Sequence, residues 1–337
     1  MASISLSRSM AVLLTAACFG AAPAGADVAG FYKGNTVEVL IGFSSGGGFD
    51  AYGRLVARNI GRHIPGGPTV VAKNAPGAGS AKAVRSLEAR PKDGTVIVAF
   101  NPGLVLRSMT EPKKVKIRFT DVALIGSVSA NVGVCYMWHT KGVKTWNDLT
   151  KKKQIILGAT AKGTSAYIEG TLLKNLFNLP VKMIIGYPGS RDVMLAVERG
   201  ELDGNCGTWQ SIPANWRRDK KIFVTYTYTK TKPEGIDAPY LLDLAKDEAQ
   251  RKMLRMVVAY NDIFRPFAVA RGILEDRLKA LRDALWATVH DKAFLAEAER
   301  AKRPIIGPLR GEKMDRIIAE MYATPPDLIK KAAVAIK

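Results

Sequence analysis

The chain is poor in the side chains that most catalytic and metal sites require. Only three histidines occur in 337 residues, His63, His139 and His290, and they lie far apart in no metal-ligand pattern. No pair of carboxylates follows strand-like segments in an arrangement typical of acid–base catalysis. We therefore expect no catalytic residue, no metal and no cofactor.

Cysteine is equally scarce. Besides Cys18 near the N-terminus, only Cys135 and Cys206 occur. In an oxidising compartment these two can pair. Two buried free thiols are equally compatible with the sequence, because spacing alone does not show whether the Cα atoms come within bonding range.

Acidic residues are few compared with basic ones. The chain has 30 Asp and Glu against 50 Lys and Arg, which gives a net charge of +20. Such a balance favours nucleic acid, anionic membrane surfaces or anionic solutes as partners. Because the basic residues are scattered and no nucleic-acid-binding motif is present, we exclude nucleic acid and expect a solvated basic surface that steers anions.

No apolar run is long enough for a comfortable membrane span. The apolar segment Met10–Phe19 follows the single charge of Arg8 and precedes Ala24-Gly25-Ala26, which is the layout of a secretory signal peptide. We expect residues 1–26 to be removed near Ala26 and the mature protein to reside in the periplasm. Cys18 leaves a lipoprotein as the alternative, although Thr15 stands where a larger aliphatic residue is usual.

Strand-like and helix-like segments alternate along the chain, which predicts an α/β fold with largely parallel sheets. We expect strands at 36–43, 69–74, 96–100, 122–127, 132–138, 154–158, 182–186 and 223–226. The C-terminal third is helical and charged after one strand-like segment, Arg265–Ala270. We therefore expect two α/β lobes around a cleft: residues 27–127 with a C-terminal return at 261–337, and residues 128–260.

Three strand-to-helix turns are candidates for anion binding. The first, Phe43–Asp50, contains three consecutive glycines, and Asp50 is a plausible N-cap of the helix expected at 51–62. Such a turn can aim backbone N–H groups and a helix dipole at an anion, although a plain tight turn is the alternative. It fits neither the P-loop nor the dinucleotide-binding pattern.

The second turn ends in Gly163-Thr164-Ser165 and the third is Tyr187-Pro188-Gly189-Ser190. Both supply hydroxyls and backbone N–H groups that can bind a carboxylate. Simple N-capping by Thr164 or Ser165 is the alternative. Because the closing glycine of a nucleophile elbow is missing, we do not interpret Ser165 as a hydrolase serine.

These motifs, in this order, resemble the Bug extracytoplasmic solute receptors, the substrate-binding family of tripartite tricarboxylate transporters. The resemblance covers nearly the whole mature chain. It is carried by Phe43–Asp50, Asn74–Gly79, Asp93–Thr95, Trp146–Leu149, Gly163–Ser165, Tyr187–Ser190 and Gly200–Asp203.

The resemblance implies a monomeric, hinged, two-lobed periplasmic binding protein of type II that encloses a ligand carboxylate and delivers it to membrane transporter subunits. The ligand-binding residues that it implies are Phe43, Ser44, Ser45, Gly46, Gly47, Gly48 and Phe49 from the first lobe, and Ala161, Gly163, Thr164, Ser165, Tyr187, Pro188, Gly189 and Ser190 from the second.

The chain departs from the family pattern at several of these positions. Ser44-Ser45 replaces Ala-Pro, Phe49 stands where Thr is common, and Pro188 replaces a lysine. We therefore expect a mono- or dicarboxylate with an apolar or aromatic body rather than a highly charged tricarboxylate. A sensory binding protein and an exported α/β hydrolase are the alternative functions.

Overall fold

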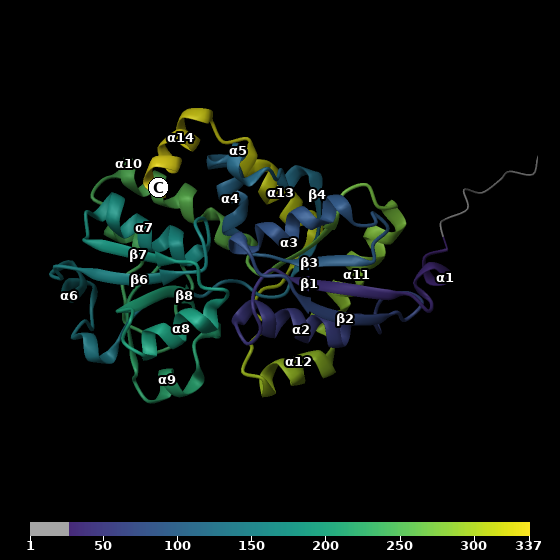
Figure 1. Cartoon of the computed structure of the whole chain (residues 1–337), viewed down its shortest axis with the longest axis horizontal. Helices are drawn as coiled ribbons and strands as arrows, with labels where there is room; N and C mark the ends of the chain where they lie inside the picture. The colour runs from purple at the N-terminus through teal and green to yellow at the C-terminus, as the bar shows by residue number, and fades with distance from the viewer. Residues whose placement is uncertain (1–26) are drawn as a thin grey trace, which may run out of the picture.

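Two β-sheets, each covered by helices, form the body of the molecule (Figure 1). Residues 27–337 are described by a computed structural model; the predicted signal peptide and Cys18 lie outside the described residues. Within residues 27–337, no helix is long and apolar enough to cross a membrane. The mixed α/β architecture agrees with the fold class predicted from the sequence.

The first sheet has six strands in the order β11-β4-β10-β3-β1-β2. Its strands are β1 (Thr36–Ile41), β2 (Thr69–Asn74), β3 (Val96–Ala99), β4 (Val122–Ser127), β10 (Pro266–Ala270) and β11 (Leu309–Arg310). The helices around it are α1 (Val28–Tyr32), α2 (Gly48–Ile60), α3 (Ala81–Arg85), α4 (Gly103–Thr110), α5 (Pro112–Val115), α11 (Glu275–His290), α12 (Lys292–Arg300) and α13 (Gly311–Tyr322).

The second sheet has five strands in the order β7-β6-β8-β5-β9. Its strands are β5 (Gly133–Trp138), β6 (Ile155–Ala159), β7 (Val181–Ile185), β8 (Gly204–Thr208) and β9 (Ile222–Thr227). The helices of this half are α6 (Trp146–Thr150), α7 (Ser165–Phe177), α8 (Ser190–Glu198), α9 (Ala214–Arg218) and α10 (Glu248–Val258).

Both sheets contain a strand that is antiparallel to both of its neighbours, and in the first sheet the edge strand β11 is also antiparallel to β4. In the first sheet β10 is antiparallel to β3 and β4, and in the second β5 is antiparallel to β8 and β9. Each of these strands directly follows a crossing of the chain from one sheet to the other. The two sheets are therefore joined by two chain segments, residues 128–132 and 264–265.

Burial explains why these segments form strands and helices. Every residue of β3 and β4 is buried, as expected for strands covered on both faces. Helix α2 is amphipathic, and its Tyr52, Leu55 and Val56 pack into the core beneath the sheet. The last helix, α14 (Pro326–Ala335), instead packs on α10 and α7 of the other half as well as on α4.

The structure corrects several details of the sequence-based expectations. The sheets are mixed rather than largely parallel, because β5, β10 and β11 make antiparallel pairings. Helix α2 begins at Gly48 with Gly47 as its N-cap, so Asp50 is in the first turn and is not the N-cap. Strand β8, which is central to the second sheet, was not expected, because its sequence Gly-Asn-Cys-Gly-Thr has low strand propensity. Helices α1, α4, α5, α9 and α14 were also not expected.

Candidate functional site

A pocket lies between the two sheets, where the carboxyl ends of β1, β3 and β6 lead into loops. Ligands of open α/β sheets bind at this edge. The residues that line it are Phe43, Gly47, Phe49, Asn101, Tyr136, Thr160, Thr164, Ser165, Ala166, Ser190, Val193, Met194, Asn205, Cys206, Gly207, Thr208, Ser211, Ile212, Tyr228, Phe264 and Arg265.

Three helices begin at this pocket. The N-caps of α2, α7 and α8 are Gly47, Thr164 and Gly189, and none makes a side-chain capping hydrogen bond. The Thr164 hydroxyl donates instead to the carbonyl of Ala161, at 2.8 Å. The first N–H groups of a helix lack intrahelical acceptors and carry the positive end of its dipole, so uncapped starts favour an anion.

The three helix starts differ in the number of acidic residues near their first turns. The Asp50 carboxylate accepts from the amide of Gly46 at 2.8 Å, and Asp192 lies in the first turn of α8. Helix α7 has no acidic residue in its first turn. The α7 start, where Thr164, Ser165 and Ala166 line the pocket, is therefore the one start of these three with no carboxylate in its first turn.

Among the described residues that line the pocket, none is Asp, Glu, Lys or His, and Arg265 supplies the only charge. Burial lowers the pKa of Arg265 to about 10, so the guanidinium remains protonated at neutral pH. The Tyr136 hydroxyl and the Asn205 side-chain carbonyl are also buried without a hydrogen-bond partner. Buried polar atoms normally have partners, and a polar ligand would supply them.

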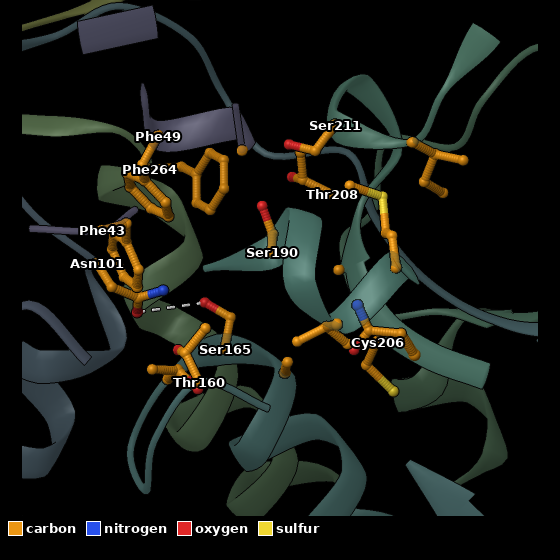
Figure 2. A pocket seen from close by; sticks show the side chains of 18 of the residues that line it. Phe43, Phe49, Asn101, Thr160, Ser165, Ser190, Cys206, Thr208, Ser211 and Phe264 are labelled. Atoms are coloured by element: carbon orange, nitrogen blue, oxygen red, sulfur yellow. Dashed lines mark hydrogen bonds between the residues drawn. The ribbon is translucent and has the colours of Figure 1, made fainter. Parts of the chain in front are cut away.

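Three aromatic rings form one side of the pocket. The rings of Phe43 and Phe49 stack with their centroids 4.8 Å apart, and the centroids of Phe49 and Phe264 are 5.9 Å apart. Figure 2 shows these rings on one side of the pocket and the hydroxyls of Ser190 and Ser211 on the other. The site therefore combines polar groups for an anion with an apolar surface for the rest of a ligand.

Direct contacts join the two halves around the pocket. The Ser44 hydroxyl donates to an Asp192 carboxylate oxygen at 2.9 Å, and the amide of Gly48 donates to Ser190 Oγ at 3.2 Å. Across the pocket, Ser165 Oγ donates to Asn101 Oδ1 at 3.5 Å (Figure 2). The structure therefore describes an arrangement in which the pocket is closed over.

The consecutive glycines of the first loop serve this close approach. A Cβ added to Gly47 would lie 2.6 Å from Ser190 Oγ, and one added to Gly48 would collide with Ser211 Oγ. Both contacts reach residues of the other half of the molecule. The glycines thus allow the loop to pack closely against Ser190 and Ser211 of the other half. The sequence analysis instead predicted that they allow the backbone to approach a ligand.

The structure brings together six of the residues that the sequence nominated, and it separates the others from this pocket. Those that line it are Phe43, Gly47, Phe49, Thr164, Ser165 and Ser190. Ala161, Tyr187 and Pro188 line a neighbouring cavity that also contacts Phe43. Ser44, Ser45, Gly46, Gly48, Gly163 and Gly189 line neither cavity. The ligand contacts themselves remain predictions.

The sequence analysis did not identify the pocket residues on β8 and its neighbours, here called the floor of the pocket, nor Arg265 in the segment that connects the two sheets. The missed lining residues include Asn101, Tyr136, Asn205, Cys206, Thr208, Ser211 and Arg265. Several lie on β8, whose composition gave no strand signal. The sequence analysis placed Arg265 in a strand-like segment. Its position just before β10, where the chain returns to the first sheet, was the one signal that could have indicated a role in binding.

The two cysteines also meet at this floor. Cys135 on β5 faces Cys206 on β8 in the strand register, and the two form a disulfide. Cys206 lines the pocket, so the cross-link lies directly behind the ligand space. The alternative of two free thiols does not apply to this structure.

Comparison with known proteins places the fold. No protein-family model and no curated protein matches the sequence. Solved structures do match. A structure described as "a periplasmic transporter" is 18% identical over 91% of this chain and 100% of that chain, with a TM-score of 0.74. The periplasmic binding protein BugD is 19% identical over 90% of this chain and 99% of that chain, with a TM-score of 0.72. An R. palustris protein solved with adipate is 16% identical over 89% of this chain and 97% of that chain, with a TM-score of 0.69. The chain has the fold of these periplasmic binding proteins.

Proposed function

We propose that the protein is a receptor that captures a small organic carboxylate between its two lobes. One observation carries the proposal: three helices whose N-cap residues make no side-chain capping hydrogen bond begin at one pocket, and the described lining of this pocket contains no carboxylate. A negatively charged group is the ligand that best balances this potential. The similar structure solved with adipate supports the same ligand class.

We further propose that the protein works in the periplasm as a monomer and presents its liganded form to the membrane subunits of a tripartite tricarboxylate-type transporter. The fold shared with periplasmic binding proteins supports this role. In the proposed cycle, residues 27–127 with 261–337 form one lobe and residues 128–260 the other, and ligand binding favours the closed arrangement.

The alternatives have less support. Ser165 lies at the pocket, but its hydroxyl bonds to Asn101, and no histidine is among the described lining residues to activate a nucleophile. Within residues 27–337 no cluster of His, Cys, Asp and Glu suited to a metal was found. A signalling receptor would use the same pocket and would differ only in its partner.

A matched ligand panel tests the proposal. The mature protein is titrated calorimetrically with hexanoate, adipate, benzoate and citrate, and with the corresponding neutral amides. We expect at least one carboxylate to bind and its amide to give no heat, because the helix starts select for negative charge. Saturating ligand should also raise stability by about 3 kcal/mol at a hundredfold excess over Kd. Equal binding of acid and amide, or no binding by any acid, would contradict the proposal.

A further inference from the structure

Arg265 is placed where an arginine is energetically unfavourable without a negative partner. Its side chain lines the pocket and is 2% exposed. Nη2 donates to Ser211 Oγ at 2.9 Å, whereas Nη1 is buried with no hydrogen-bond partner. Removing a guanidinium from water and leaving a donor unpaired costs free energy that an anion would restore.

The surroundings of Arg265 contain cations and rings rather than carboxylates. The guanidinium carbon lies 4.0 Å from the ring centroid of Tyr52 and 4.9 Å from that of Phe264. A second arginine, Arg303, is close enough to oppose the charge of Arg265. No ion pair with Arg265 or Arg303 occurs among the described residues.

The backbone at Arg265 points to the same interpretation. Its φ is +53°, in the left-handed region that residues other than glycine rarely adopt. Glycine would occupy this position without strain, at the segment where the chain re-enters the first sheet. A side chain kept at a strained, buried position in a pocket is a candidate for function.

The two anion-favouring features lie at separate ends of the pocket. Figure 2 shows Ser165, at the start of α7, on one side and Ser211, the hydrogen-bond partner of Arg265, on the other, with Ser190 between them. The rings of Phe49 and Phe264 flank the space between these ends. The α7 start and Arg265 are therefore two distinct features of the pocket lining, on different segments of the chain.

We propose that Arg265 is a second anion anchor, so that the preferred ligand carries two carboxylates joined by an apolar body, one at the α7 start and one against the guanidinium. This inference rests on the proposed function and assigns the specificity of its site. A bidentate pair between Arg265 and a carboxylate satisfies Nη1 and neutralises the buried charge.

The test compares diacids with monoacids of the same chain length. The pairs are succinate and butyrate, adipate and hexanoate, and suberate and octanoate, titrated calorimetrically at neutral pH into the wild type, Arg265→Met and Arg265→Lys. Arg303→Met is the matched control, because Arg303 donates to the Gln210 carbonyl at 2.6 Å but does not line the pocket.

We expect the wild type to bind its best diacid about tenfold to a hundredfold more tightly than the matched monoacid. Arg265→Met should remove this preference and leave monoacid affinity unchanged, Arg265→Lys should keep part of it, and Arg303→Met should keep it fully. If Arg265 only joined the lobes through Ser211, Arg265→Met would weaken both ligands equally, which would overturn the proposal.

If Arg265→Met fails to fold, Arg265→Lys still reports on the anchor, and the wild-type comparison can still overturn the proposal. Equal affinity for diacid and monoacid in the wild type overturns the anchor while the receptor function stands. The absence of binding by every acid overturns both. The two failures are therefore distinguishable.

Discussion

Glu169 is a buried carboxyl group with no cationic partner. It lies on α7, where Oε1 accepts from the Tyr260 hydroxyl at 2.8 Å and Oε2 has no partner. Burial raises its pKa from 4.5 to about 8. The facing groups Tyr226, Tyr228 and Tyr260 have pKa values raised by burial, so they stay neutral in this range. Glu169 is therefore protonated in the folded protein at neutral pH.

This raised pKa predicts how stability changes with pH. Between pH 4.5 and 8 the folded state holds a proton on Glu169 that the unfolded state releases, so the free energy of unfolding falls as the pH rises. The slope from this group approaches about 1.4 kcal/mol per pH unit. Glu169→Gln should remove this loss, and urea unfolding of both proteins at pH 5 and pH 8 measures it. Parallel pH profiles would contradict the prediction.

Gly47 gives a second prediction for a single residue. A side chain at this position meets Ser190 across the pocket, so Gly47→Val should weaken ligand binding more than about tenfold without unfolding the protein, since its φ of −83° suits any residue. Calorimetry with the best ligand measures the loss. Removing the obstacle, as in Gly47→Ala with Ser190→Gly, should recover part of the affinity that Gly47→Ala loses. No recovery would show that the contact with Ser190 is not the cause.

At the scale of the element, the disulfide joins β5 to β8 behind the pocket. It closes a loop across a sequence separation of 71 residues. By loop entropy a cross-link of this size stabilises the folded state by about 4 kcal/mol. We expect Cys135→Ala with Cys206→Ala to lower the free energy of unfolding by that order, measured by urea unfolding under oxidising conditions. An unchanged midpoint of the wild type after reduction would contradict this.

The elements also show what the sequence could and could not predict. Strands such as β1 and β4 were predicted because strands that are buried on both faces are largely apolar runs. Strand β8 was missed because its glycines and Asn205 fit a strand only through pairing with β5 and β6. Tertiary pairing overrides local propensity there. The helix starts at the pocket were predicted from turn residues, whereas Arg265 enters the site through the topology of the crossing chain.

For the whole molecule, the contacts between Ser44 and Asp192 and between Gly48 and Ser190 indicate a closed arrangement. We expect solution scattering to show a larger radius of gyration without ligand and a decrease on saturation. The Gly47→Val variant should keep the larger radius of gyration, because the valine side chain obstructs the approach of the first loop to Ser190. A wild-type radius that does not change at saturation would argue against hinge closure.

The position of β10 late in the sequence, between two early strands of the first sheet, has a consequence for how the protein can be engineered. A fragment ending near residue 127 would contain β3 and β4 but lack β10, the strand between them. The first sheet therefore cannot come from one continuous fragment, whereas residues 128–260 contain all five strands of the second sheet. A recombinant exchange that replaces residues 128–260 as one segment therefore leaves both sheets complete, whereas a fragment that omits residues 266–270 breaks the first sheet between β3 and β4.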